Sequence, residues 1–405
     1  MKNSLLNWFK NIYGDNEGVD VYFAPGRVNL IGEHTDYNGG HVFPCALEIG
    51  TYGAVRLRND RTLRFYSVNF PEIGVIISSL DDVLSGDELI YYRKDEWAKY
   101  PKGIFWAFAQ HPYFKKYIEA KDGSLLLNCG MDILYYGDIP NSSGLSSSAS
   151  IEVLTAYIIK ELYQVDISLK DISLLSQYAE NKYVGVNSGI MDQFAIAMGK
   201  RNHAIFLNTS TLEYEYAPLN LGNNKIVIAN SNKRRGLSDS KYNERRSECE
   251  EALRRLQSAI NVNNLGDLSN DEFESHKDAI KEEILIRRAR HAVYENQRTI
   301  EAVKALKADD MQSFGILMNE SHISLRDDYE VTGHELDTMV EAAWKQDGII
   351  GARMTGAGFG GCTVNIIDAG YIEEFIDNVG TIYKEKTGLS ADFYVVDIGG
   401  GPVRI

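Results

Sequence analysis

The stretch Pro140-Asn-Ser-Ser-Gly-Leu-Ser-Ser-Ser-Ala-Ser150 leads directly into an apolar helical pattern that begins near Ser147. Small residues let the backbone approach a phosphate group, and the amide groups at a helix start point toward an anion along a favourable dipole. Serine hydroxyls can also complete a magnesium shell shared with phosphate oxygens. An ordinary serine N-cap needs one hydroxyl, so three consecutive serines favour a phosphate loop. The lysine of a Walker loop, GxxxxGK[ST], is absent.

The hydrophobic patterns around this turn predict an α+β chain. Before it, short β-branched or aromatic runs bounded by turn residues predict strands: Val19–Phe23, Ala54–Leu57, Gly74–Ile77, Leu125–Asn128 and Asp132–Tyr136. After it, helical periodicity covers Ser147–Tyr163 and Leu169–Tyr183.

The second half opens with a strand and continues mostly as helices, starting with one that Ser238 caps. Further helices are predicted over Asp278–Lys307, Asp310–Glu320, Val331–Lys345 and Ile372–Lys386, and strands over Lys225–Ala229, Thr363–Ile367 and Phe393–Asp397. A chain of 405 residues is long for one core, so we predict two domains, 1–212 and 213–405, with the boundary within 205–225.

Composition excludes several classes of protein. The formal net charge of −15 argues against binding nucleic acid or an anionic membrane, because both need basic patches. No stretch approaches the roughly 20 apolar residues of a transmembrane helix. The amphipathic N-terminal segment has no small-residue cleavage site, and the four cysteines show no metal-like pair or disulfide framework. We therefore expect a cytoplasmic protein.

A second segment, Ala24-Pro-Gly-Arg-Val-Asn-Leu-Ile-Gly-Glu-His-Thr-Asp-Tyr-Asn-Gly-Gly40, follows a predicted strand. Its carboxylates can accept hydrogen bonds from hydroxyl groups, and its imidazole can donate or accept them, so the segment suits a polyhydroxyl ligand. A polar turn in which Asp36 and Asn38 satisfy their own backbone explains the residues equally well.

The third segment, Arg353-Met-Thr-Gly-Ala-Gly-Phe-Gly-Gly-Cys-Thr363, contains glycines at the spacing of the GxGxxG dinucleotide fingerprint. A strand-like run follows these glycines where that fingerprint requires a helix. A glycine-rich closure over a ligand fits better, and a purely structural tight turn is the alternative.

Together the three segments resemble the small-molecule kinase superfamily of galactokinase, homoserine kinase, mevalonate kinase and phosphomevalonate kinase. Within it, the Glu-His-Thr-Asp-Tyr of the second segment is similar to the galactokinase family, and the resemblance runs from about residue 20 to the C-terminus. It implies an N-terminal domain like domain 2 of ribosomal protein S5, a ferredoxin-like C-terminal domain with the third segment, and an active site in the cleft between them. The sugar- and nucleotide-binding domain would be 1–212.

The resemblance also implies roles for individual residues. Arg27 and Asp192, the latter in Gly-Ile-Met-Asp-Gln-Phe, match the pair that flanks the anomeric hydroxyl of the sugar. Asp192 would accept the anomeric proton, and Arg27 would stabilise its carboxylate and offset charge on the transferring group. The positions that match sugar-holding residues are Glu33, His34, Thr35, Asp36 and Tyr242.

The same resemblance implies two substrates and a metal ion: ATP, a sugar and Mg²⁺. Ser148 and Glu180 match the magnesium ligands. The nucleotide contacts would be Ser67, Trp97, Tyr100, Ser142, Ser143, Gly144, Leu145, Ser146, Ser147 and Ser148.

The implied reaction moves the γ-phosphoryl group of Mg-ATP to the anomeric hydroxyl of D-galactose and yields galactose 1-phosphate and ADP, as in the Leloir pathway of galactose catabolism. We expect small-molecule partners only and a monomer. One alternative is a kinase for N-acetylgalactosamine or arabinose. Another is a non-catalytic galactose sensor, which the intact Gly144–Ala149 disfavours. In a third, Arg27 and Asp192 form only a structural ion pair.

Overall fold

The computed structural model describes residues 1–86, 96–139, 144–233 and 238–405. The N-terminal half is built on a six-stranded sheet, in which β4 and β6 run parallel to each other and the other strand pairs among the described residues are antiparallel. Its strands, in spatial order, are β13 (Val403–Arg404), β1 (Asp20–Asn29), β3 (Pro44–Leu57), β6 (Met131–Gly137), β4 (Thr62–Ser67) and β5 (Ile76–Ser79).

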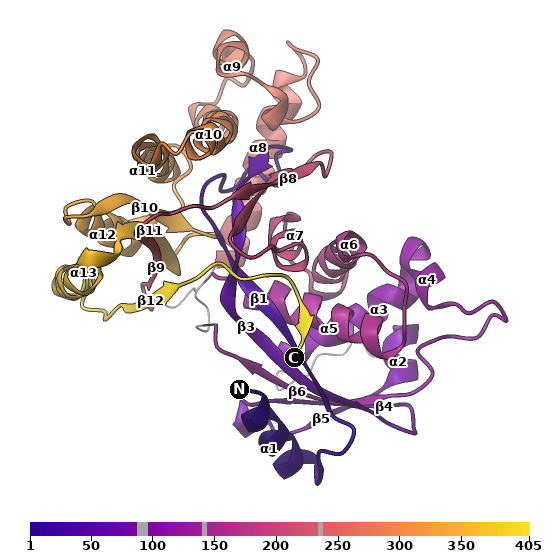
Figure 1. Cartoon of the computed structure of the whole chain (residues 1–405). Coiled ribbons are helices and arrows are strands. Elements are labelled where there is room, and N and C mark those ends of the chain that lie inside the picture. The colour runs from indigo at the N-terminus through magenta and orange to yellow at the C-terminus, as the bar shows by residue number, and fades with distance from the viewer. Residues whose placement is uncertain (87–95, 140–143, 234–237) are drawn as a thin grey trace.

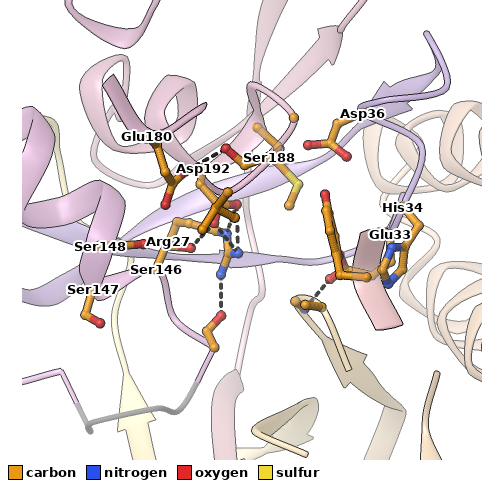
Figure 2. A pocket seen from close by; sticks show the side chains of 17 residues that line it. Arg27, Glu33, His34, Asp36, Ser146, Ser147, Ser148, Glu180, Ser188 and Asp192 are labelled. Carbon is orange, nitrogen blue, oxygen red and sulfur yellow. Dashed lines mark hydrogen bonds and ion pairs between the residues drawn. The ribbon is translucent and has the colours of Figure 1, made fainter. Parts of the chain in front are cut away.

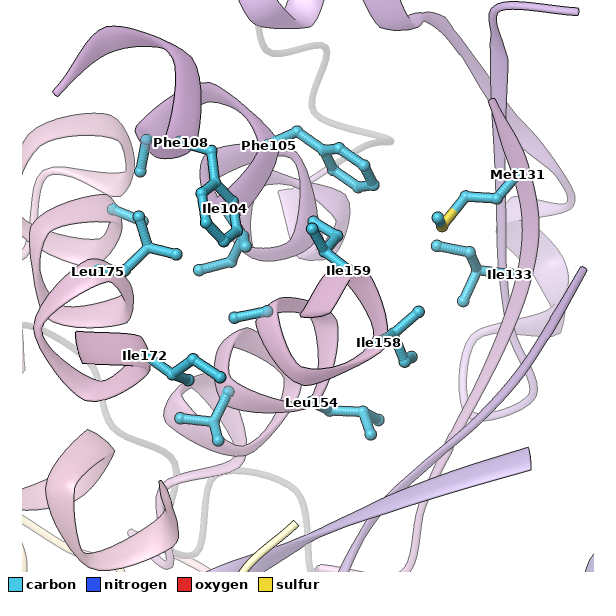
Figure 3. Close-up of a cluster of buried hydrophobic side chains, with 14 of the residues drawn as sticks. Ile104, Phe105, Phe108, Met131, Ile133, Leu154, Ile158, Ile159, Ile172 and Leu175 are labelled. Carbon is cyan, nitrogen blue, oxygen red and sulfur yellow. The ribbon is translucent and has the colours of Figure 1, made fainter. Parts of the chain in front are cut away.

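Helices cover both faces of this sheet. Neighbouring residues along a strand point to opposite faces, and apolar side chains on each face pack against helices. Ile133 packs against the large helical layer, whereas Leu134 packs against α1 (Lys2–Tyr13). The large layer holds α3 (Lys99–Gln110), α5 (Ser147–Leu162) and α6 (Leu169–Ala179), whose apolar side chains meet in Figure 3. The remaining helices of this half are α2 (Leu80–Ser85), α4 (Pro112–Ile118) and α7 (Met191–Ala197).

The C-terminal half contains a four-stranded antiparallel sheet in the order β10-β11-β9-β12. These strands are β9 (Asn224–Asn230), β10 (Ile349–Thr355), β11 (Cys362–Asp368) and β12 (Asp392–Val396). The helices are α8 (Ser238–Leu256), α9 (Asn270–His276), α10 (Glu283–Lys307), α11 (Met311–Asp327), α12 (Gly333–Ala343) and α13 (Ile372–Thr387). Figure 1 shows α12 and α13 beside the sheet and α8 to α11 gathered above it.

Short elements complete the fold. A small sheet joins β2 (His41–Val42), β7 (His203–Asn208) and β8 (Tyr214–Pro218). Single 3₁₀ turns lie at Pro71–Ile73, Glu96–Ala98, Leu265–Asp267, Lys277–Ala279 and Ala369–Tyr371, and a π-helical turn, η3, spans Glu180–Val184.

The two halves share buried contacts. Val28 and Phe43 from the first half belong to one apolar cluster with Ile228, Phe314 and Val364 from the second. The last strand, β13, returns to pair with β1. The end of the chain therefore returns to the sheet of the first half. The division at residue 212 stays a prediction.

One predicted strand is wrong. Residues 125–128 form an irregular segment in which only Leu125 makes an isolated bridge, to Glu119. This segment buries Leu127 and then turns at Gly130, where an added Cβ would lie 1.9 Å from the carbonyl oxygen of Thr62. Its apolar residues therefore fill the core without pairing in the sheet.

Several predicted boundaries also shift for local reasons. The helix expected from Asp278 begins at Glu283, because Lys281 adopts a φ of 71° that interrupts it. The helix expected over Leu169–Tyr183 changes to the π-helical turn at Glu180. In the part of the chain that the structure describes, no helix has both the length and the apolar character needed to cross a membrane.

Candidate active site

A cavity of about 220 Å³ opens between elements of the two halves. Figure 2 shows Arg27 and Asp192 in its middle, with serines and Glu180 on one side and Glu33, His34 and Asp36 on the other. The lining residues are Arg27, Glu33, His34, Asp36, Gly144, Ser146, Ser147, Ser148, Glu180, Val186, Ser188, Gly189, Met191, Asp192, Tyr242, Gly356 and Ala357.

The central feature of the cavity is a bidentate ion pair. Nε and Nη2 of Arg27 each donate to one carboxylate oxygen of Asp192, both over 2.8 Å. The Arg27 side chain is 4% exposed, whereas that of Asp192 is 28% exposed. The guanidinium is therefore a fixed support from β1, and the carboxylate at the start of α7 faces the open space.

Helix α5 begins at the same point. Ser146 precedes it with a left-handed φ of 60°, and its hydroxyl donates to Asp192. Nη1 of Arg27 donates to the carbonyl of Gly144 over 2.6 Å, which ties the serine turn to the ion pair. The first amides of an α-helix have no intrahelical acceptor, so this end of α5 offers donors to an anion.

Glu180 lies at the junction of α6 and the π-helical turn, a distortion frequent at functional sites. One carboxylate oxygen accepts from Ser188 over 2.6 Å and from Gln193 over 2.7 Å. Burial raises the pKa of Glu180, although the hydrogen bond from Ser188 opposes this shift. Glu180 and Ser148 together present only oxygen atoms, which suit Mg²⁺.

No group of three or more His, Cys, Asp or Glu side chains within the described ranges could hold a metal ion by itself. Mg²⁺ is commonly bound by one or two carboxylates together with substrate phosphates. Ser148 and Glu180 fit such a shared shell and not an all-protein cage.

The opposite side of the cavity is formed by the loop of residues 30–40, between β1 and β2. One carboxylate oxygen of Glu33 accepts from Thr355 over 3.0 Å and from the amide of Gly356 over 2.8 Å, so this residue joins the second and third segments of the sequence analysis. Burial lowers the pKa of His34 to about 3, which keeps its ring neutral, and Nδ1 lies 2.7 Å from the hydroxyl of Tyr37.

Asp36 is partly exposed to the cavity. Burial, and then the nearby carboxylates of Asp192 and Glu33, raise its pKa to about 7. Gly189 passes so close that a Cβ there would lie 1.8 Å from the Asp36 carboxylate. The site therefore contains a carboxyl group that changes charge near neutral pH.

Tyr242, from α8, completes this side of the cavity. Its ring centroid lies 5.6 Å from that of His34 and 5.4 Å from that of Tyr37. Burial raises the pKa of Tyr242 well above its usual value, so the hydroxyl stays protonated and can donate.

The structure does not bring every predicted residue to the cavity lining. The Thr35 hydroxyl donates to the carbonyls of Gly32 and His41 and so holds the loop itself. Leu145 is buried behind the serine turn, in the apolar cluster that both halves share. The predicted substrate and nucleotide contacts of these two residues stay predictions.

Three other residues predicted to contact the nucleotide, Ser67, Trp97 and Tyr100, lie elsewhere in the N-terminal half. Ser67 pairs in the sheet beside Tyr135, and the Trp97 ring lies 5.9 Å from the ring of Tyr135. Tyr100 lies in the first turn of α3. Ser142 and Ser143 lie outside the described residues.

Sequence reasoning missed several residues of the site. Ser188 lines the cavity directly before the quoted Gly-Ile-Met-Asp-Gln-Phe. Two residues inside this motif received no role from the sequence, although Gly189 lines the cavity and Gln193 donates to Glu180. Glu152 is fully buried on α5, where it accepts from Gln193 over 3.3 Å. A carboxylate on the apolar face of a predicted helix was the available signal for Glu152, because such a residue is almost never buried without a partner.

Family models match along most of the chain. One described as "Galactokinase galactose-binding signature" matches residues 7–57. Models described as "GHMP kinases N terminal domain" and "GHMP kinases C terminal" match residues 104–200 and 302–385. The matches place an N-terminal and a C-terminal kinase domain in this order.

Full-length relatives agree with these models. Galactokinases of Clostridium acetobutylicum and Fusobacterium nucleatum subsp. nucleatum are 56% and 53% identical to this chain, over 403 and 406 residues. The alignments cover 100% of this chain and 99% and 100% of the relatives.

Solved structures show the same pattern. The Lactococcus lactis galactokinase complexed with galactose is 46% identical, with a TM-score of 0.93 and 100% coverage of both chains. A Methanococcus jannaschii mevalonate kinase is 18% identical, with a TM-score of 0.63 and coverage of 94% and 98%. The second likeness shows the fold alone.

Proposed function

The chain belongs to the galactokinase family, and on this premise we propose how its cavity phosphorylates galactose. It is an ATP-dependent sugar kinase of the two-domain GHMP fold. The observation that carries the proposal is the half-open Arg27–Asp192 pair, which stands between a helix start suited to phosphate and a polar loop suited to a sugar.

Asp192 accepts the proton of the anomeric hydroxyl as this oxygen attacks the γ-phosphorus, and the bond from that phosphorus to the ADP oxygen breaks. The partly exposed carboxylate supports this role, because a base must reach the proton it removes. Arg27 stabilises the carboxylate and offsets charge that builds on the transferring group. The products are galactose 1-phosphate and ADP.

The sugar side of the site is formed by Glu33, His34, Asp36 and Tyr242, with Thr35 shaping the loop. Ionised carboxylates accept from sugar hydroxyls, and the Tyr242 hydroxyl donates. Because the pKa of Asp36 is raised to about 7, galactose affinity should rise as the pH increases through 7.

The nucleotide side is formed by the start of α5. Gly144, Ser146, Ser147 and Ser148 line the cavity there, and we assign them to the ATP phosphates. Ser148 and Glu180 would hold Mg²⁺, which neutralises negative charge on the phosphate oxygens when bound. Ser67, Trp97 and Tyr100 are proposed for the nucleoside end.

The finer fold assignment is also a proposal. The C-terminal sheet order β10-β11-β9-β12, with helices after β9 and β11, supports a ferredoxin-like βαββαβ arrangement. The mixed six-stranded sheet with helices on it supports the likeness to domain 2 of ribosomal protein S5. Cavity residues from both halves, such as Arg27 and Gly356, support an active site in the cleft between the domains.

We further propose a cytoplasmic monomer that serves galactose catabolism through the Leloir pathway. The absence of disulfides among the four cysteines is in keeping with a reducing compartment. Sedimentation equilibrium would test the monomer, since a mass of 45.5 kDa is expected and twice this mass would contradict it.

The first experiment is ATP-dependent phosphorylation of galactose, N-acetylgalactosamine, arabinose, glucose, mevalonate and homoserine. Turnover confined largely to galactose is expected, with galactose 1-phosphate as the product. A stronger response to another sugar would overturn the substrate, and galactose binding without turnover would indicate a sensor.

A further inference from the structure

The loop that carries Glu33, His34 and Asp36 has a backbone that needs support from outside. Gly32 has a φ of 94° and His34 a φ of 61°, and the second value is uncommon for a residue with a side chain. Such conformations persist where the surrounding structure fixes them. The support comes from α10, in the other half of the chain.

Glu295 makes the central contact. It is fully buried, and its Oε1 accepts from the amides of Gly32 over 3.0 Å and Glu33 over 3.2 Å. The hydroxyl of Ser321 donates to the same oxygen over 2.6 Å, and Nε of Arg298 donates to Oε2 over 2.9 Å. Burial is the largest single influence and raises the pKa of Glu295, but Arg298 and the other polar groups around it together lower the value to about 2.

Two other residues of α10, His291 and Asn296, also contact the loop or the residue that follows it. Burial lowers the pKa of His291 to about 4, and its neutral ring lies with Nε2 3.1 Å from the carbonyl oxygen of Glu33. Oδ1 of Asn296 accepts from the amide of His41 over 2.7 Å. Positions 291 and 295 are one helical turn apart, and 296 adjoins them, so a single face of α10 holds both ends of the loop.

We propose that Glu295, assisted by His291 and Asn296, is a positioning residue for galactose. None of the three lines the cavity. Glu295 instead fixes the two successive amides that precede His34, and so sets where the side chains of Glu33, His34 and Asp36 stand. This inference rests on the proposed sugar role of these three residues.

The test compares Glu295→Gln with Glu295→Ala, measuring KM for galactose, KM for ATP, kcat, and the galactose dissociation constant by calorimetry without ATP. Hydrogen bonds to a charged group are the stronger ones, so galactose KM and Kd should rise about 10- to 100-fold in the alanine variant. A smaller rise is expected in the glutamine variant, which keeps Oε1. The KM for ATP should change less than about threefold.

Asp132→Asn is the matched control, because Asp132 is a buried carboxylate bound by three arginines in the N-terminal sheet. It should lower the melting temperature and leave both KM values unchanged. If Glu295→Ala fails to fold, Asn296→Ser should still raise the galactose Kd about three- to tenfold.

Galactose affinity that is unchanged in the Glu295 or Asn296 variants, or a parallel rise of both KM values, would overturn the positioning role. Asp36→Asn is measured beside them to separate this failure from a failure of the proposed sugar site. If Asp36→Asn raises galactose Kd while the α10 variants do not, only the inference on α10 is lost. If none of them does, the assignment of the loop to the sugar fails.

Discussion

At the scale of the residue, the site depends on which charged groups are enclosed and which face the cavity. Arg27 is enclosed and Asp192 is partly open, although they form one ion pair. A base needs this asymmetry, since its partner must stay fixed while the carboxylate reaches the substrate. An ion pair that served only stability would not need a carboxylate that is exposed to the cavity.

Asp192→Asn tests the base. The amide keeps the size of the side chain but cannot accept the anomeric proton, so kcat should fall by about 10²- to 10⁴-fold. Galactose Kd should stay within about threefold of wild type, measured by calorimetry. Near-normal kcat would mean that Asp192 orients the hydroxyl without removing its proton.

Gly189→Ala tests the contact between Gly189 and Asp36. The added Cβ would meet the Asp36 carboxylate at 1.8 Å, so Asp36 must move and galactose KM should rise by about tenfold or more, in line with the cost of overpacking. Gly400→Ala is the matched control, because its nearest neighbour would lie 4.0 Å away. Equal kinetics for the two variants would show that Asp36 does not contribute to sugar binding.

At the scale of the element, the start of α5 is held by what packs behind it. Leu154 and Ile158 on α5 point toward the sheet, while α3 and α6 also pack against α5 (Figure 3). Burial of each such side chain contributes about 1.5–3 kcal/mol. The packing of α5 in this apolar cluster thus supports the serine turn at its N-terminus.

Leu154→Ala should therefore lower the free energy of unfolding by about 2–5 kcal/mol through the cavity it leaves. Urea denaturation measures this change. The KM values for galactose and ATP of the folded fraction should match wild type, since Leu154 does not line the cavity. A large rise in the KM for ATP with unchanged stability would contradict this separation.

At the scale of the whole molecule, folding collects carboxyl groups that would repel one another when ionised. The pKa values of Asp36, Glu152 and Glu180 are all raised, in each case chiefly by burial. A raised carboxyl pKa means that the folded state binds protons more tightly than the unfolded chain. Stability from these groups is therefore present at low pH and is lost as the pH rises through their folded pKa values.

The contribution of these carboxyl groups to the free energy of unfolding of the ligand-free protein should thus fall as the pH rises from about 4 to about 7. Asp36 alone, shifted from 3.8 to about 7, should account for a decline on the order of 2 kcal/mol, less than its full shift implies because it opens onto the cavity. Asp36→Asn should flatten this decline in urea titrations at pH 5.5, 7 and 8.5. A stability difference between wild type and Asp36→Asn that does not change from pH 5.5 to pH 8.5 would contradict it.

Two buried histidines change the stability in the opposite direction as the pH rises. His34 and His291 are kept neutral by burial, with pKa values lowered to about 3 and about 4. The unfolded chain binds their protons first, so their contribution is lost as the pH falls below about 6.5. The contribution of the two histidines should therefore decline as the pH falls from about 6.5 to about 4, opposite in sign to that of Asp36.

The sequence by itself determined the order of elements and the three segments that meet at the site. Helical periodicity predicted α5 and α13, because burial on one face of a helix repeats every 3.6 residues. Runs of β-branched or aromatic residues predicted β1, β3, β5, β6, β9, β11 and β12 but not the other strands. The motifs placed Arg27, Asp192 and the serines together by resemblance, and in the structure Arg27 and Ser146 both donate hydrogen bonds to Asp192.

Only the tertiary structure decided which side chains enter the cavity. Two features depend on contacts between residues far apart in the chain. Gly189 lies close to the Asp36 carboxylate, and Glu295 accepts hydrogen bonds from the backbone of the loop. Local patterns carry no signal for such contacts. Their geometry, and with it the pKa of Asp36, is set by burial among neighbours that are adjacent only after folding.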